Sequence, residues 1–202
     1  MPIDRAPRFV LNVGGNSKTT PIPTHYDNWT QHLLDIDPAG APDIVCDARK
    51  LGTFDGRKYD SVYCSHNLEH YHHHDARLVL AGFMHVLNDD GFADIRVPDI
   101  QEVMKACIER NLDLDDVLYS APAGPILVRD VLWGYGPQIE ESGNDFFAHK
   151  TGFSPKSLTA FLQQAGFGEI FIGASAPERY EIIALAFKRP GPNPHKALFG
   201  LP

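Results

Sequence analysis

Seven short apolar runs, spread along most of the chain, constrain its fold more than any other feature. Five of them lie in the first half, at residues 8–13, 32–36, 42–48, 59–65 and 91–98. Their nearly continuous apolar character is typical of parallel strands that are covered on both faces. The last two runs, 169–174 and 181–189, are separated by a short polar segment, which favours antiparallel neighbours. The pattern predicts one seven-stranded sheet whose last strand is antiparallel.

Helical patterns lie between several of these runs. Residues 75–91 carry an apolar stripe, with Asp75 as a plausible N-cap. A second helix is expected to begin at Asp99, because a glutamate follows three positions later at capping-box spacing. A third begins at Ser154, with proline in its first turn, and ends at Gly166. We therefore expect an α/β, doubly wound, Rossmann-like fold with helices on both faces of the sheet.

The domain organisation follows from length and from the segments that fit no regular pattern. A chain of 202 residues suits one core, so we expect a single domain over residues 1–189. Residues 111–150 are rich in glycine, proline and aromatics and are too long for an ordinary connection, which predicts a cap inserted after the fifth strand. Trp133 and Tyr135 could stack on a bound acceptor or form the cap's own core. Residues 190–202 are expected to form a surface or disordered tail.

Composition limits the classes of function. The chain is 43% hydrophobic and 22% charged and has no apolar run long enough to span a membrane. Its net charge of -8 disfavours a nucleic-acid partner, because phosphate binding requires clustered basic side chains. The first residues do not resemble a secretory signal, and three cysteines cannot all pair within the chain. We therefore expect a soluble, cytoplasmic protein that does not bind membranes.

The first strand runs into Gly14 and Gly15 but lacks the features of a phosphate-binding turn. Two prolines follow within eight residues, so no helix can begin at once and present its N-terminus to a pyrophosphate. Asp35 ends the second strand about twenty residues later, where a carboxylate binds the hydroxyls of a ribose, and Asp47 ends the third. A nucleoside without phosphate in an acidic site describes S-adenosylmethionine, whose sulfonium is cationic.

Six segments, taken in order, resemble the class I S-adenosylmethionine-dependent methyltransferases. They read "LNVGGN", "LLDIDP", "DIVCDARKL", "YDSVYCSHNLEH", "VLNDDGFADIRVPD" and "TGFSPKSLTAFLQQAGF". The resemblance covers about residues 9–189, and the order of the segments makes it specific. It implies methyl transfer from S-adenosylmethionine to a small molecule, such as a hydroxyl of a sugar or secondary metabolite.

The resemblance also implies a cofactor site. Its expected members are Val13, Gly14, Gly15, Asn16, Asp35, Ile36, Asp47, Ala48, Ser65 and His66. Within this set, the glycine turn would pass the methionyl part, Asp35 would bind the ribose, Asp47 would contact the adenine, and His66 would lie beneath the sulfonium. Asn12 and Asn16 depart from the family pattern. Because asparagine tolerates positive φ, we expect the turn to keep its shape.

Candidate catalytic residues follow the fourth strand. Methyl transfer requires mainly alignment, and a base is needed only when the acceptor holds its proton at neutral pH. His66 and Glu69 are the leading candidates, followed by His70, with His149 reaching in from the cap. Glu69 and His70 could instead begin the next helix.

Three other interpretations compete with this one. The histidine run raises a metal site, but adjacent loop histidines cannot all face one ion and no HExxH pattern is present, so no metal is expected. A non-catalytic or partner-dependent binding module of the same fold is the main alternative to an enzyme. A nicotinamide dehydrogenase is disfavoured by the missing phosphate turn. The acceptor and the oligomeric state stay open.

Overall fold

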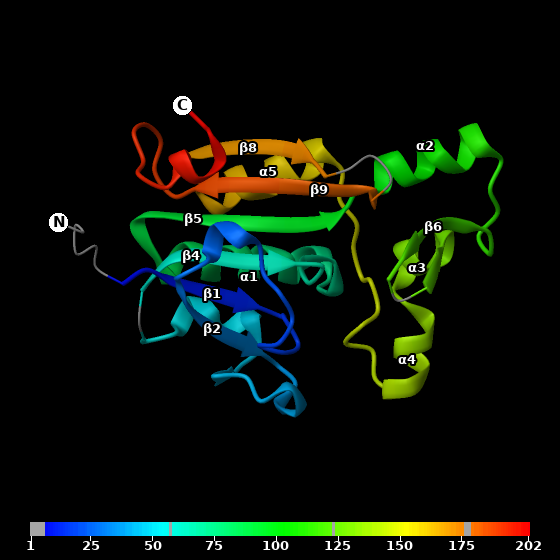
Figure 1. Ribbon diagram of the computed structural model, residues 1–202, viewed down its shortest axis with the longest axis horizontal. Helices are drawn as coiled ribbons and strands as arrows, with labels where there is room; N and C mark the ends of the chain where they lie inside the picture. The colour runs from blue at the N-terminus through cyan, green and yellow to red at the C-terminus, as the bar shows by residue number, and fades with distance from the viewer. Residues whose placement is uncertain (1–6, 57, 123, 176–178) are drawn as a thin grey trace.

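A seven-stranded mixed sheet forms the centre of the protein (Figure 1). The computed structural model describes residues 7–56, 58–122, 124–175 and 179–202. The strands of this sheet are β1 (Phe9–Val13), β2 (Thr30–Asp35), β3 (Ile44–Val45), β4 (Tyr59–Ser65), β5 (Leu87–Pro98), β8 (Glu169–Ala174) and β9 (Glu181–Phe187). Their order is β3-β2-β1-β4-β5-β9-β8, and β9 runs antiparallel to both of its neighbours. The predicted doubly wound topology with an antiparallel last strand is confirmed.

Two strands differ in length from the prediction. β3 has two residues rather than seven, because the Asp43 side chain accepts from Leu33 N at its start (2.8 Å) and Asp47 begins a 3-10 helix at its end. β5 begins at Leu87, four residues early, since Leu87 already pairs with Tyr59 of β4 across an irregular register. The Asn-Asp-Asp-Gly segment is therefore part of the strand and does not separate it from the helix.

One face of the sheet is covered by α1 (His73–Val86), α5 (Pro155–Ala165) and the 3-10 helix η3 (Ala48–Thr53). The expected cap of α5 is confirmed, because the Ser154 side chain accepts from the backbone and Gly166 closes the helix at φ 99°. The helix predicted over residues 75–91 is present as α1, but the predicted N-cap is wrong. Its N-cap is His72, and Asp75 lies in the first turn, where a carboxylate favours the positive end of the helix dipole.

The other face is covered by short 3-10 helices, η1 (Thr24–Tyr26) and η6 (Lys196–Phe199). The prolines that follow β1 explain why no α-helix lies there. The segment 190–202, expected to be a tail, instead packs on this face. Its apolar side chains join a second core centred on Tyr26, Trp29 and Phe92.

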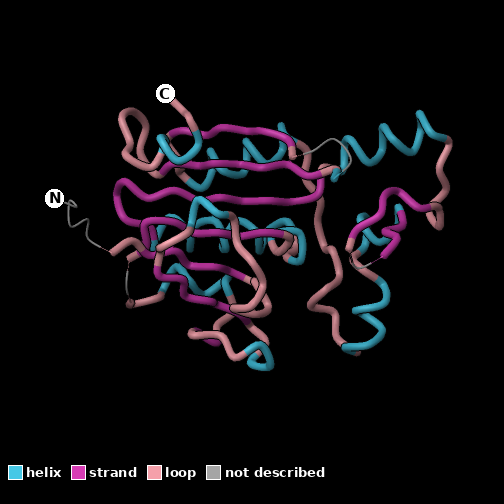
Figure 2. Tube along the Cα trace, in the orientation of Figure 1, coloured by secondary structure: helices cyan, strands magenta, loops and turns pink. Residues whose placement is uncertain are grey.

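The region between β5 and α5 forms a cap beside the carboxyl ends of the parallel strands (Figures 1 and 2). It contains α2 (Ile100–Arg110), β6 (Val117–Ala121), β7 (Gly124–Leu127), α3 (Val128–Trp133) and α4 (Gly136–Ser142). The α2 helix begins as predicted, with Asp99 accepting from two backbone N–H groups. Val103, Leu118 and Val128 form a small core within the cap. Among the described residues, no helix is long and apolar enough to cross a membrane.

Candidate functional site

The turn after β1 keeps a left-handed shape with asparagine in place of the final glycine. Gly14 has φ 71° and Asn16 has φ 59°, as expected for this turn. A Cβ on Gly14 would lie 2.0 Å from the side-chain nitrogen of Asn67, so the close approach also requires glycine. The backbone N–H of Asn16 donates to Oδ2 of Asp35 (3.0 Å). The acid at the end of β2 thus holds the turn in place.

Asp35 is half-buried at the carboxyl end of β2. Its second oxygen, Oδ1, accepts from the backbone N–H of Asp37 (3.0 Å). Each carboxylate oxygen has two lone pairs, so both can accept a further hydrogen bond from a ligand.

A cavity of about 380 Å³, here called the turn cavity, lies in front of this turn. The expected cofactor residues that line it are Gly14, Asn16, Asp35, Ile36, Asp47 and His66. The other four do not line it. The side chains of Val13 and Ala48 are buried in the core, Gly15 faces Asn12, and Ser65 lies outside the lining.

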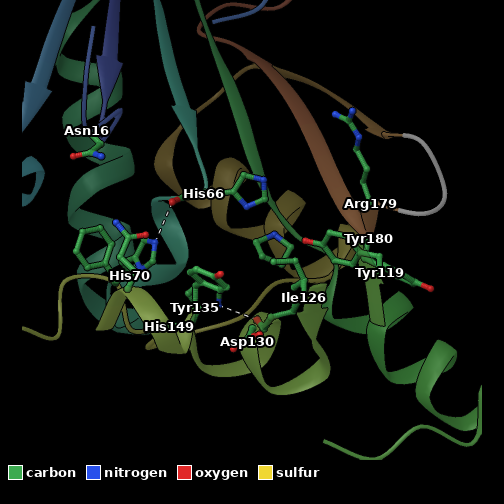
Figure 3. A pocket seen from close by; sticks show the side chains of 14 residues that line it. Asn16, His66, His70, Tyr119, Ile126, Asp130, Tyr135, His149, Arg179 and Tyr180 are labelled. Carbon is green, nitrogen blue, oxygen red and sulfur yellow. Dashed lines mark hydrogen bonds between the residues drawn. The ribbon is translucent and has the colours of Figure 1, made fainter. Parts of the chain in front are cut away.

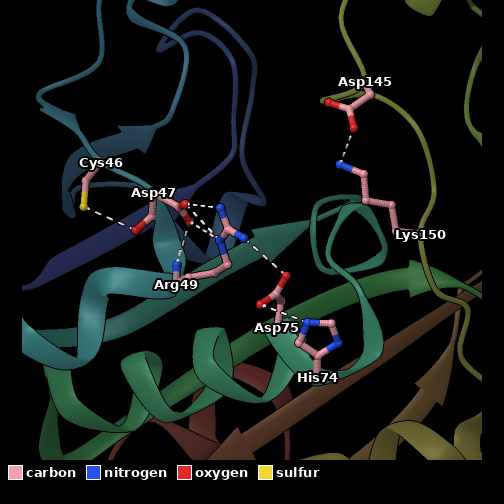
Figure 4. A network of polar contacts seen from close by, with 7 residues as sticks. All are labelled: Cys46, Asp47, Arg49, His74, Asp75, Asp145 and Lys150. Carbon is pink, nitrogen blue, oxygen red and sulfur yellow. Dashed lines mark hydrogen bonds and ion pairs between the residues drawn. The ribbon is translucent and has the colours of Figure 1, made fainter.

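Asp47 both caps a helix and lines the turn cavity. It caps η3 by accepting from Arg49 N (3.0 Å), and it also lines the turn cavity. The Arg49 guanidinium donates to Oδ2 of Asp47 at 2.9 and 2.6 Å and to Oδ1 at 3.1 Å, and it reaches Asp75 at 3.3 Å (Figure 4). These hydrogen bonds hold the pKa of Asp47 below its usual range.

The turn cavity has an excess of negative charge. The acidic residues that line it are Asp35, Asp37, Asp47, Asp75 and Asp145. Its cationic residues are fewer: Arg49, bound to Asp47, Lys150, whose ammonium lies 3.2 Å from Asp145 (Figure 4), and His66, which is described below. The cavity is therefore suited to a neutral or cationic ligand.

A second cavity, here called the cap cavity, lies between the strand ends and the cap and measures about 340 Å³. Its apolar and aromatic lining consists of Pro98, Tyr119, Ile126, Val131, Tyr135, Phe147 and Tyr180. The two cavities share Asn16, His66, His70 and Phe147. In Figure 3, His70 and His149 lie on one side of the cap cavity, Tyr119 and Tyr180 lie on the other, and His66 lies between them. Trp133 does not line this cavity.

His66 follows β4 in a left-handed conformation (φ 48°), which is uncommon for a residue other than glycine. Its Nε2 donates to Oε1 of Glu181 (2.8 Å), and its Nδ1 lies 3.5 Å from Oε1 of Glu69. Burial alone would lower the pKa of His66, but these two carboxylates raise it to about 10. At neutral pH His66 is therefore an imidazolium with a proton on each nitrogen.

Glu69 lies in the 3-10 helix η4 (Leu68–His70) and is 1% exposed. Burial would raise its pKa, yet the facing His66 holds the pKa below its ordinary value. The backbone oxygen of Glu69 accepts from Lys150 N (2.8 Å), which fixes the segment after the cap against η4.

His149 reaches this cluster from the segment after the cap. Its Nδ1 donates to the carbonyl oxygen of Val131 (2.8 Å), so the neutral ring carries a lone pair on Nε2. Nε2 lies 4.0 Å from Oε1 of Glu69. Burial lowers the pKa of His149, which keeps the ring neutral. Its ring centroid is 4.9 Å from that of His70, so all four candidate catalytic residues lie together.

Several residues of these cavities were missed by the sequence analysis. Glu181 could have been found, because an antiparallel strand begins at the edge where its parallel neighbours end. Arg49 follows an expected cofactor residue by two positions, but no local pattern shows where its side chain points. Other lining residues of the cap cavity come from a segment with no clear period, such as Tyr119, or lie just before β9, as Tyr180 does.

Several solved structures with a similar fold are described as methyltransferases. One is a 1,6-didemethyltoxoflavin N1-methyltransferase from Burkholderia thailandensis, solved with 1,6-didemethyltoxoflavin and S-adenosylhomocysteine. The match covers 91% of this chain and 72% of the methyltransferase chain, with 15% sequence identity and a TM-score of 0.55. A methyltransferase from Archaeoglobus fulgidus matches 90% and 86% at 15% identity and a TM-score of 0.55. An O-methyltransferase family protein from Burkholderia thailandensis matches at 14% identity and a TM-score of 0.53. There this chain, matched over 92% of its residues, spans 52% of the other protein.

No protein-family model matches the chain, and no curated protein matches it by sequence. The strand order and the structural matches together carry the conclusion. The chain has the fold of the class I S-adenosylmethionine-dependent methyltransferases.

Proposed function

We propose that this protein transfers a methyl group from S-adenosylmethionine to a small molecule bound in the cap cavity. The observation that carries the proposal is the pair of adjoining cavities that meet at His66 and Asn16, at the carboxyl ends of the parallel strands. Open α/β sheets bind their ligands at this edge. One cavity would hold the cofactor and the other the acceptor, with the methyl group between them.

The turn cavity has the features that the cofactor requires. Asp35 would accept hydrogen bonds from the ribose hydroxyls while it retains those from Asn16 and Asp37. Ile36 and Asp47 would lie beside the adenine. The excess of carboxylates would favour the cationic sulfonium over its neutral product, which assists release of S-adenosylhomocysteine.

The cap cavity suits an acceptor with an apolar or aromatic body and one hydroxyl group. Tyrosine rings and Phe147 would pack against the body, and the volume of about 340 Å³ falls in the range of small-molecule sites. The hydroxyl would face the side of the cap cavity that carries His70 and His149, because these side chains provide polar atoms near the residues that line both cavities.

His66 is assigned a positioning function rather than that of a general base. Both of its ring nitrogens face carboxylates, of Glu181 and Glu69, and hold protons. It would fix these two acids below the junction of the cavities. The acceptor would lose its proton beside the unclaimed Nε2 lone pair of His149.

The reaction is an in-line displacement. The acceptor oxygen attacks the methyl carbon, the carbon–sulfur bond breaks, and its electron pair returns to sulfur, giving the thioether S-adenosylhomocysteine. The leaving group is already activated, so alignment of donor and acceptor supplies most of the acceleration.

Incubation with methyl-labelled S-adenosylmethionine and a panel of small phenols and sugars tests the proposal. We expect label in at least one organic product, together with one equivalent of S-adenosylhomocysteine. A protein that binds the cofactor but labels no panel member beyond a boiled control would favour the binding-module alternative.

A further inference from the structure

The carboxylate of Glu69 is buried without a hydrogen-bond donor at normal geometry. Within the described part of the chain, neither Oε1 nor Oε2 accepts a hydrogen bond, and the residue is 1% exposed. The nearest charged or polar nitrogens are Nδ1 of His66, at 3.5 Å, and Nε2 of His149, at 4.0 Å. Buried carboxylates normally accept several hydrogen bonds, and the charge of His66 at 3.5 Å leaves the lone pairs of this one available to a further partner.

The rings of His149 and His70 are the other potential ligands beside Glu69. His149 donates through Nδ1 to Val131, which leaves Nε2 as an acceptor that faces the carboxylate. His70 has Nδ1 at 3.2 Å from the carbonyl oxygen of Ala148 and Nε2 at 3.0 Å from that of His66.

One ligand atom from each of Glu69, His70 and His149 lies within 4.8 Å of the others. Bonds of about 2.0–2.2 Å to a shared ion require only a modest contraction of the cluster. Two imidazoles and one carboxylate suit zinc and similar transition metals, whereas magnesium and calcium take oxygen ligands. Three protein ligands would leave a position open.

We propose that Glu69, His70 and His149 bind a divalent transition-metal ion of the zinc class. The inference departs from the expectation of no metal, which considered only histidines adjacent in sequence. His149 comes from the segment after the cap and meets η4 only in the folded chain.

The open position faces the cap cavity, because His70 and His149 line its wall. The use of this position rests on the proposed function. With the ion bound, Nε2 of His149 would be a ligand and could not receive the acceptor's proton. The acceptor hydroxyl, bound to the ion, would instead have a lowered pKa and would release its proton to solvent. The resulting oxygen anion would attack the methyl carbon, and the sulfur would take the electron pair of the broken bond.

Titration of chelator-treated protein with Co²⁺ and with Zn²⁺ tests the site. Calorimetry gives the stoichiometry, and the visible absorption of bound Co²⁺ reports nitrogen and oxygen ligands or, through an intense charge-transfer band, thiolates. We expect one tight equivalent without a thiolate band. His149→Gln and Glu69→Gln should each weaken it at least ~100-fold, more than loss of an outer partner does.

A matched control is the double variant His73→Gln, His74→Gln, which removes two exposed histidines outside the cluster. It should keep the tight equivalent. The inference is overturned if the wild type binds no stoichiometric metal, if the control loses the site, or if the ligands prove to be thiolates.

S-adenosylhomocysteine binding, measured on the same samples, separates this inference from the proposed function and shows that each variant is folded. Co²⁺ binding without nucleoside binding would support the metal site and contradict the methyltransferase proposal. S-adenosylhomocysteine binding without Co²⁺ binding would support the cofactor site and contradict the metal site.

Discussion

Replacement of Asp35 by alanine gives the sharpest test of how the turn cavity binds a nucleoside. The carboxylate accepts two backbone N–H groups at 3.0 Å, from Asn16 and Asp37, and would accept the ribose hydroxyls in addition. Hydrogen bonds to a charged group contribute about 1.5–3 kcal/mol, so loss of the ribose contact should weaken S-adenosylhomocysteine about 10- to 150-fold. Asp35→Asn retains one acceptor oxygen, so its affinity for S-adenosylhomocysteine should lie between those of Asp35→Ala and the wild type.

The same substitution also removes support from the glycine turn, so stability needs a control. Asp60 accepts from Phe9 N at 2.8 Å and lies at the opposite end of the sheet. Asp60→Ala should lower the midpoint of thermal unfolding and leave calorimetric affinity for S-adenosylhomocysteine unchanged. A folded Asp35→Ala protein that binds within about threefold of wild type would refute the ribose assignment, because such a difference is under 1 kcal/mol.

Three further predictions concern the surroundings of the site. His66 has a raised folded pKa of about 10, so its stabilising contribution is complete below about pH 6.5 and is lost as the pH rises towards 10; urea unfolding of His66→Gln should therefore depend less on pH over this window. Asp47 has a lowered pKa, so its contribution is present above about pH 4 and is lost in more acidic solution. The stability of Arg49→Ala should therefore fall less steeply than that of the wild type as the pH is lowered below about 4. An unchanged dependence of stability on pH would contradict the pairing of Arg49 with Asp47. Tyr26→Phe removes a buried hydrogen bond to Ser61 (2.7 Å) and should cost about 1–2 kcal/mol in denaturant titrations, whereas no loss would mean that Ser61 finds another partner.

The sheet could be predicted because its signals are local. Each strand of the first half is an apolar run bounded by polar residues, and the helix that follows Ser154 carries its own start and stop signals. Chirality and short connections then limit the order of the strands. The length of β3 could not be predicted, since it depends on the Asp43 side chain and on the edge position of the strand.

The second face of the sheet was harder to predict. Prolines after β1 exclude a helix there, but nothing local shows that the C-terminal segment takes its place. In the sequence, Leu198 and Phe199 belong to a proline-rich tail. Their packing is favourable because it covers the apolar face around Tyr26, which would otherwise contact water.

The candidate site was predictable in composition rather than in geometry. Asp35 and His66 follow strands, so their place at one edge of the sheet is fixed by topology. The contacts of Glu69 with His149, and of His66 with Glu181, join residues far apart in sequence and arise only when the cap and β9 fold back. The left-handed conformation of His66 is likewise invisible in the sequence.

Calorimetric titration of the wild-type protein with S-adenosylmethionine and, separately, with S-adenosylhomocysteine tests the central claim most directly. The account predicts one site per chain with micromolar affinity for at least one of the two. No detectable binding of either by a demonstrably folded sample would contradict the assignment of the turn cavity to this cofactor.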